Sequence, residues 1–148
     1  MGCYVCSGVA GNLFSAMCEH DMVSVGASTA INGLLTGILA MILANWEAFS
    51  GNPQLEQARC CLLFFIVFMV AMNITGMGYV THDRNDGWAG TDYLGHAGGC
   101  MGGLFYGLAF FPRAPTESGH KSRLIGMFLF GVFFIMFGLL FYLNYDNM

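Results

Sequence analysis

Four apolar stretches, each about 20 residues long, run through this chain and leave it very few folds to adopt. They occupy residues 28–48, 60–80, 92–111 and 123–143. A helix of about 20 apolar residues is long enough to cross the hydrocarbon core of a bilayer. Only 9% of the 148 residues are charged, against about 25% in an ordinary soluble domain. A chain this short cannot hide so much apolar surface inside one soluble core.

The predicted fold class is therefore all-α, a polytopic transmembrane helix bundle that forms a single domain over residues 1–148. Polar connections with turn residues separate the spans, at about 18–27, 49–59, 81–91 and 112–122. A shorter apolar stretch, residues 2–17, is interpreted as the end of a helix whose beginning is missing or lies elsewhere. The bundle is accordingly expected to be truncated at its N-terminus.

Composition also excludes several functional classes. The net charge is −4 and no run of basic residues is present, so no nucleic-acid partner is expected. Cys3 and Cys6 have the CxxC spacing, but a single pair without further ligands is weak evidence for metal or redox chemistry. His20, His82 and His120 lie in the polar connections, where they are expected to be surface residues. We therefore predict no metal site, and we expect the lipid bilayer to surround the chain.

The basic residues predict the orientation of the spans. Four of the five lie in or beside the connections 49–59 and 112–122: Arg59, Arg113, Lys121 and Arg123. The opposite side carries only Arg84. Lys and Arg collect on the cytoplasmic side of membrane proteins. The connections 18–27 and 81–91 and the C-terminal tail are therefore expected to face outward or into a lumen.

Ser28 and His96 are the residues best suited to chemistry. Ser28 opens the stretch 28–48 and His96 lies near the start of the stretch 92–111, and one full span separates the two. Both helices thus enter the bilayer from the same face, and both side chains are expected within a turn or two of it. A serine hydroxyl becomes a good nucleophile when a base takes its proton. Histidine is able to act as that base near neutral pH.

Small residues that recur every four positions allow these two helices to approach closely. They are Gly33 and Gly37 in the first stretch, and Gly95, Gly99, Gly103 and Gly107 in the second. The spacing leaves an alternative open, in which the glycines form a plain packing stripe and His96 is a structural residue beside it. Ionisable residues inside a membrane are nevertheless candidates for function by default.

Three segments resemble parts of the rhomboid family of intramembrane serine proteases. Segment 25–35 (VGASTAINGLL) is similar to the GxSG motif and the helix after it. Segment 92–107 (DYLGHAGGCMGGLFYG) is similar to the family's HxGGxxxG histidine helix. Segment 4–16 (YVCSGVAGNLFSA) resembles the end of the preceding helix, including its Gly-Asn pair. The order and spacing agree, and the resemblance covers roughly residues 4–112.

The resemblance implies a function and a site. Ser28 would be the nucleophile, His96 the general base and Gly26 the first motif glycine, and the Ser28 backbone N–H would help to hold the oxyanion. The activity implied is cleavage of transmembrane proteins near the membrane surface, without a cofactor. The stretches from 2–17 to 92–111 would correspond to the third to sixth core helices, and 123–143 to an additional C-terminal helix.

Three departures from the family pattern favour a different class of function. Thr29 stands at the second glycine of GxSG, and Asn32 replaces a position that is often aromatic. Asn32 is expected to hydrogen-bond either to His96 or to a neighbouring helix. The first two family helices, which carry a His and an Asn of the oxyanion hole, are absent. The alternative is a catalytically inactive rhomboid-like protein that binds transmembrane clients as an adaptor or subunit.

Overall fold

The computed structural model describes residues 1–18, 27–75, 92–115 and 117–144. Within these ranges the chain forms helices and no strand. They are α1 (Gly2–Cys18), α2 (Ser28–Ala44), the short 3-10 helix η1 (Trp46–Phe49), α3 (Pro53–Thr75), α4 (Tyr93–Phe110) and α5 (Glu117–Asn144). The prediction of an all-α helix bundle is confirmed.

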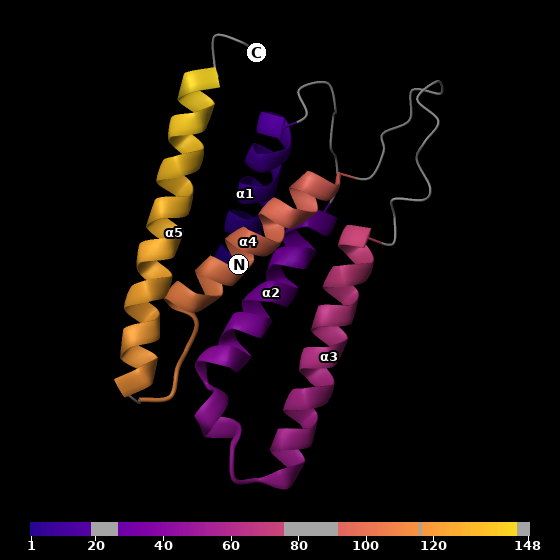
Figure 1. The fold of residues 1–148 in the computed structure, drawn as a ribbon, viewed down its shortest axis with the longest axis vertical. Helices are drawn as coiled ribbons and strands as arrows, with labels where there is room; N and C mark the ends of the chain where they lie inside the picture. Colours follow the sequence, from indigo (N-terminus) through magenta and orange to yellow (C-terminus); the bar gives the residue numbers. More distant parts are fainter. Residues whose placement is uncertain (19–26, 76–91, 116, 145–148) are drawn as a thin grey trace.

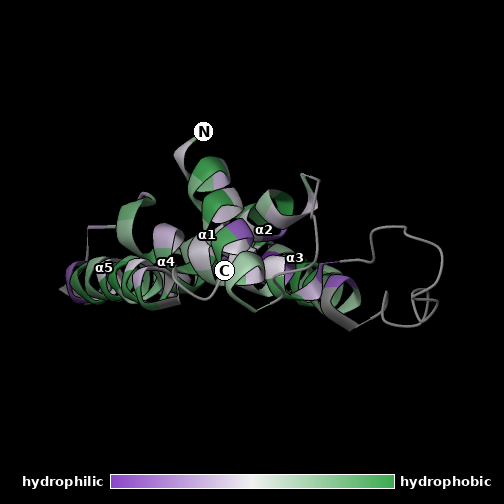
Figure 2. Ribbon diagram, turned by 90° about the horizontal axis from the view of Figure 1, so that it is seen from above, coloured by the Kyte–Doolittle hydropathy of each residue, from purple (hydrophilic) through white to green (hydrophobic). Residues whose placement is uncertain are grey.

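Helices α1, α2 and α4 form the centre of the bundle, and α3 and α5 flank it on opposite sides (Figure 1). The view from above shows the same order, with apolar residues along all five helices (Figure 2). Aromatic side chains attach α5 to the centre. Phe137 packs edge-on against Phe14 of α1, with ring centroids 5.6 Å apart, and Phe133 packs against Phe105 of α4 at 5.4 Å.

Local sequence signals determine where α3 begins. Asn52 caps the helix, because its Oδ1 accepts a hydrogen bond from the Gln54 N–H at 3.0 Å. Pro53 occupies the first helical position, where its missing N–H costs nothing. Gly51 supplies a φ of 96° in the turn before it. The helix therefore begins at Pro53, before the apolar stretch that was expected to start at residue 60.

Two helices in the described part of the chain are long and apolar enough to cross a membrane by length and composition. They are Pro53–Asn73 within α3 and His120–Leu140 within α5, with only 6% and 17% of their most apolar windows buried. Their outward faces carry large apolar side chains, among them Phe64 at 75% exposure. A soluble protein would not leave such faces in water, so they are the surfaces that lipid would cover. Helices α1 and α2 are apolar but only 17 residues long.

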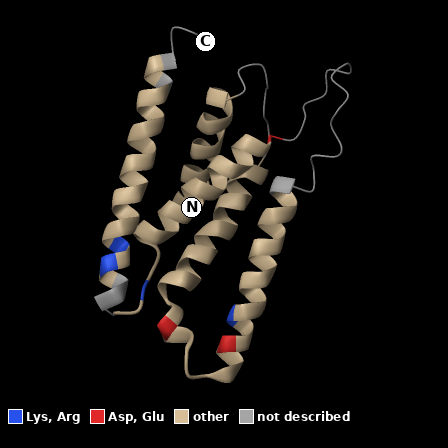
Figure 3. Cartoon of the chain, viewed as in Figure 1, with Lys and Arg blue, Asp and Glu red and all other residues tan. Residues whose placement is uncertain are grey.

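Charged residues gather at the end of the bundle where α2 ends and α3 and α5 begin (Figure 3). Arg59 lies in the second turn of α3, and its guanidinium sits 3.8 Å from the ring centroid of Trp46. Arg113 follows α4 and donates a 2.6 Å hydrogen bond to Ser122 of α5. The long helices between the two ends are otherwise nearly free of charge in the described residues.

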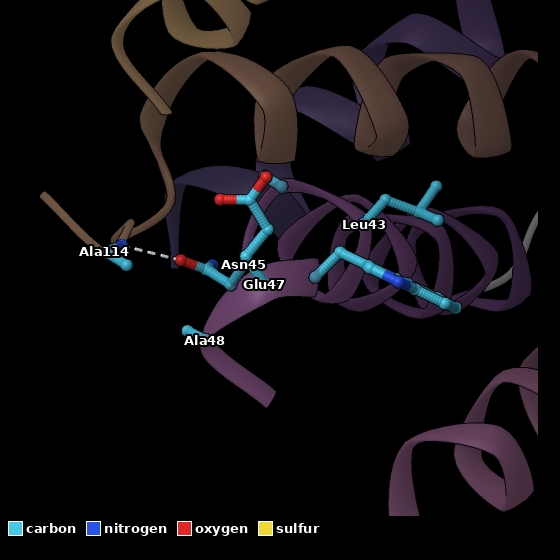
Figure 4. Close-up of a pocket in the computed structure, with 7 residues that line it drawn as sticks. Leu43, Asn45, Glu47, Ala48 and Ala114 are labelled. Carbon is cyan, nitrogen blue, oxygen red and sulfur yellow. Dashed lines mark hydrogen bonds between the residues drawn. The ribbon is translucent and has the colours of Figure 1, made fainter. Parts of the chain in front are cut away.

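Asn45 fastens this charged end of the bundle. Its Nδ2 donates to the carbonyl oxygens of Met41 at 2.8 Å and Pro112 at 3.1 Å, and its Oδ1 accepts from the Ala114 N–H at 2.7 Å. The side chain thereby joins the end of α2 to the segment after α4. A small hollow beside the junction is lined by residues 43–48, from the end of α2 and from η1, and by Ala114 (Figure 4). It lies at the opposite end of α2 from Ser28.

Candidate active site

The Ser28 hydroxyl and the His96 imidazole meet although 68 residues separate them in the chain. His96 Nε2 lies 2.8 Å from Ser28 Oγ, a hydrogen-bond distance. Ser28 is the first residue of α2 and is exposed, whereas His96 lies in the first turn of α4 and is only 3% exposed. The structure thus brings together the two residues that the sequence analysis singled out.

Glycines make this approach of α2 and α4 possible. A methyl group added at Gly99 would meet the backbone of Thr29, and one added at Gly103 would meet the backbone of Gly33. A methyl group at Gly107 would meet the backbone of Gly37 in the same way, further from the site. Because the obstacle in each case is backbone, any side chain at these positions would push the two helices apart. The predicted glycine stripe is therefore where the helices touch.

Gly95 differs from the other glycines of the stripe. A Cβ at this position would lie 2.6 Å from the carboxyl carbon of Asp92 and not against α2. Its carbonyl oxygen lies beside Gly11 of α1, which also faces the Thr29 methyl group. Helices α1, α2 and α4 therefore all pack closely against one another at the site.

Thr36 locks the two helices below the Ser28–His96 pair. Its Oγ1 donates a 2.7 Å hydrogen bond to the Cys100 carbonyl oxygen of α4, and it also lies within 3.2 Å of the Asn32 and Gly33 carbonyl oxygens of its own helix. The residue is buried. A buried hydroxyl needs such a partner, and here the hydrogen bond fixes the position of α2 along α4.

Asp92 caps the helix that carries His96. Its Oδ1 accepts from the Gly95 N–H at 2.5 Å, and its carbonyl oxygen accepts from the His96 N–H at 3.0 Å. A negative side chain at a helix N-terminus also interacts favourably with the helix dipole. The sequence analysis missed this role, although an Asp directly before a helical stretch is a recognisable capping signal.

Four buried polar atoms of α2 and of the start of α4 have no hydrogen-bond partner. They are Asn32 Oδ1, Asp92 Oδ2, Tyr93 OH and His96 Nδ1. Asn32 is 1% exposed, so its amide oxygen is cut off from solvent. Sequence reasoning left open whether Asn32 bonds to His96 or to a neighbouring helix. The structure shows neither bond at its Oδ1.

Some predicted features fall outside the described residues. These are the motif glycine Gly26, the loop histidines His20 and His82, and the connection 81–91. Among the residues that are described, no three His, Cys, Asp or Glu side chains are grouped so as to hold a metal ion. The chemistry that the described geometry supports is thus that of a hydroxyl beside an imidazole.

Comparison with known proteins gives a consistent result. A model of the Rhomboid domain matches residues 1–113. RHOMBOID-like protein 1 of Arabidopsis thaliana is 30% identical over 110 residues, which are 74% of this chain and 24% of that protein. RHOMBOID-like protein 6, mitochondrial, of the same plant is 30% identical over 125 residues, 83% of this chain and 36% of that protein.

A more distant relative is named as a protease. Rhomboid-like protease 5 of Toxoplasma gondii is 28% identical over 106 residues, which are 72% of this chain and 11% of that protein. The chain spans about a quarter to a third of the length of the plant relatives that it matches. No solved structure matches it.

Proposed function

This chain belongs to the rhomboid family, and from that premise we propose that it is a serine endopeptidase that cleaves transmembrane proteins within the membrane. The observation that carries the proposal is the 2.8 Å separation of His96 Nε2 and Ser28 Oγ. A nucleophile and a base within hydrogen-bond reach are the minimum for acyl transfer. A relative of this chain is named as a protease, which supports the proposal further.

The reaction uses the two side chains in sequence. His96 Nε2 takes the Ser28 proton as Oγ attacks the scissile carbonyl, and it then gives that proton to the departing amine. Water, activated by the same nitrogen, hydrolyses the acyl-enzyme and restores the hydroxyl. Ser28 is the first residue of α2, so its N–H has no acceptor within the helix. That N–H is the group proposed to donate to the oxyanion, together with the motif backbone at Gly26.

The proposed location is a multi-pass position in the bilayer, with α3 and α5 against lipid. The basic residues Arg59, Arg113, Lys121 and Arg123 lie at the end of the bundle away from Ser28. By the positive-inside rule that end faces the cytoplasm. The Ser28–His96 pair then opens outward or into a lumen, and substrates are transmembrane proteins whose cleavage site reaches that surface.

A client-binding adaptor without hydrolytic activity is the second candidate. The observation that favours it is the unpartnered amide oxygen of Asn32, one turn after Ser28, since Asn32 stands where the family pattern is often aromatic. An adaptor needs the helix packing around Ser28 and His96 but not their chemistry. The two candidates therefore differ in one measurable property, the reactivity of the Ser28 hydroxyl.

Labelling with a fluorophosphonate probe in membranes tests the proposal. We expect covalent labelling of the wild-type protein and its loss in Ser28→Ala and His96→Ala. Ser50→Ala is the matched control, because Ser50 is also exposed but lies at the charged end of the bundle. Labelling that survives in Ser28→Ala, or that never appears in folded wild-type protein, would exclude the protease and leave the adaptor.

A further inference from the structure

Two buried atoms near the active site have complementary needs. A neutral imidazole whose Nε2 accepts the Ser28 proton carries its own proton on Nδ1. Nδ1 of His96 is buried without a partner, and so is the amide oxygen of Asn32. The His96 Nδ1–H is then a donor that lacks an acceptor, and the Asn32 amide oxygen is an acceptor that lacks a donor. Both groups pay a desolvation cost as long as they remain apart.

The helix register places Asn32 one turn after Ser28, on the face of α2 that contacts α4. Ser28, Asn32 and Thr36 recur every four residues, so they lie on one face of α2. The first and last of them contact α4, at the His96 ring and at the Cys100 carbonyl oxygen. Asn32 lies between these two contacts and is the most deeply buried of the three side chains. Its amide is thus buried one turn below Ser28, between two points at which α2 contacts α4.

We propose that Asn32 is a positioning residue for His96, which accepts a hydrogen bond from Nδ1–H through one bridging water molecule. The inference rests on the proposed protease function. The bond holds the imidazole in the tautomer whose Nε2 is free to take the Ser28 proton. Buried waters commonly join polar groups that have no direct partner, and the partner of one ring nitrogen decides which tautomer the other presents.

Asp92 Oδ2 is the competing acceptor and must be distinguished from Asn32. It is also buried without a partner, and Asp92 precedes His96 by one helical turn. However, its carboxyl group lies over Gly95, and its other oxygen is already bonded to the Gly95 N–H. This places it at the helix cap, whereas Asn32 faces α4 from the helix that carries the nucleophile.

The test is nitrogen NMR of ¹⁵N-histidine-labelled protein in detergent micelles, with the His96 signals assigned by their loss in His96→Gln. The two neutral tautomers give different ¹⁵N shifts. We expect the Nδ1–H form in the wild type, and a mixture of tautomers in Asn32→Leu, which keeps the volume but removes the acceptor. Asn32→Asp retains an acceptor and should keep the Nδ1–H tautomer, and Ser50→Ala, at the charged end of the bundle, should leave it unchanged.

Labelling rates add a second readout. We expect Asn32→Leu to slow fluorophosphonate labelling of Ser28 about tenfold, with Asn32→Asp recovering most of the loss. An unchanged tautomer in Asn32→Leu, or one that changes only in Asp92→Asn, would overturn the role of Asn32 while leaving the protease intact. The expected tautomers without any labelling of Ser28 would instead refute the protease and leave the Asn32 contact standing.

Discussion

Replacement of Gly99 by alanine is the sharpest test of how packing produces the site. The added methyl carbon would lie 2.9 Å from the Thr29 methyl group and 3.0 Å from the Thr29 carbonyl carbon, with the carbonyl oxygen nearer still. Ordinary van der Waals contact begins at 3.4 Å. The backbone of α2 must therefore retreat by about half an ångström or more, because close-packed backbone has no free volume to yield.

The size of the effect follows from two opposing terms. Overpacking of this kind costs about 1–3 kcal/mol, and alanine returns about 0.5–1 kcal/mol over glycine through its better helix propensity. We expect a net loss of about 1–2 kcal/mol in the free energy of unfolding. Thr29 directly follows Ser28, so the same displacement stretches the 2.8 Å contact to His96. Misplacement on this scale should slow probe labelling about 10- to 100-fold.

Unfolding in mixed micelles, followed by far-ultraviolet circular dichroism, measures the stability, and fluorophosphonate labelling measures the reactivity of the Ser28 hydroxyl. Gly138→Ala is the matched control, since a Cβ there meets nothing within 4 Å, and it should be neutral or slightly stabilising. The double variant Gly99→Ala/Thr29→Gly should recover little, because the carbonyl obstacle remains. Wild-type stability and labelling in Gly99→Ala would refute the proposed backbone contact, and full recovery in the double variant would assign the obstacle to the Thr29 side chain.

Three further outcomes are expected. Thr36→Val removes the 2.7 Å bond to the Cys100 carbonyl and should lower the free energy of unfolding by about 1 kcal/mol, seen in the same micelle titration. Asp92→Ala removes the cap on the Gly95 N–H; it should cost about 1 kcal/mol and also slow labelling, because the first turn of α4 frays. Asn45→Ala breaks three hydrogen bonds at the far end of the bundle, so it should lower the free energy of unfolding by about 1–2 kcal/mol. The labelling rate of Ser28 should stay within about twofold of the wild type. A larger change in that rate would contradict the independence of the two ends of the bundle.

The sequence was enough to predict that Ser28 and His96 lie at the same end of the bundle. One full helix, α3, separates α2 from α4, so these two helices run in the same direction and begin at the same end. The glycine spacing also predicted which helices touch, since small residues in register let backbones approach. These predictions rest on periodicities of a helix and on the thickness of a bilayer, both of which are independent of side-chain detail.

The rotation of each helix about its own axis was harder to predict, and this rotation decides which polar atoms lie near Ser28 and His96. In a bundle surrounded by lipid, the packed and outward faces of a helix are both apolar, so hydropathy does not distinguish them. Gly95 belongs to the four-residue repeat, yet the Asp92 carboxyl group, and not α2, occupies the space beside it. The start of α3 at Pro53 was missed for a related reason. The first turn of α3 is polar, so a search for apolar residues does not find it, although the Asn52 cap and Pro53 stabilise it.

The two substitutions in the serine motif have different physical consequences. Thr29 is buried, but its methyl group fits against Gly11 and Gly99 on the neighbouring helices. The space that a motif glycine would leave on α2 is thus supplied from α1 and α4. Asn32 has no such compensation, because a buried amide oxygen is satisfied only by a donor. We therefore expect the reactivity of the Ser28 hydroxyl to depend more on the donor that reaches Asn32 than on Thr29.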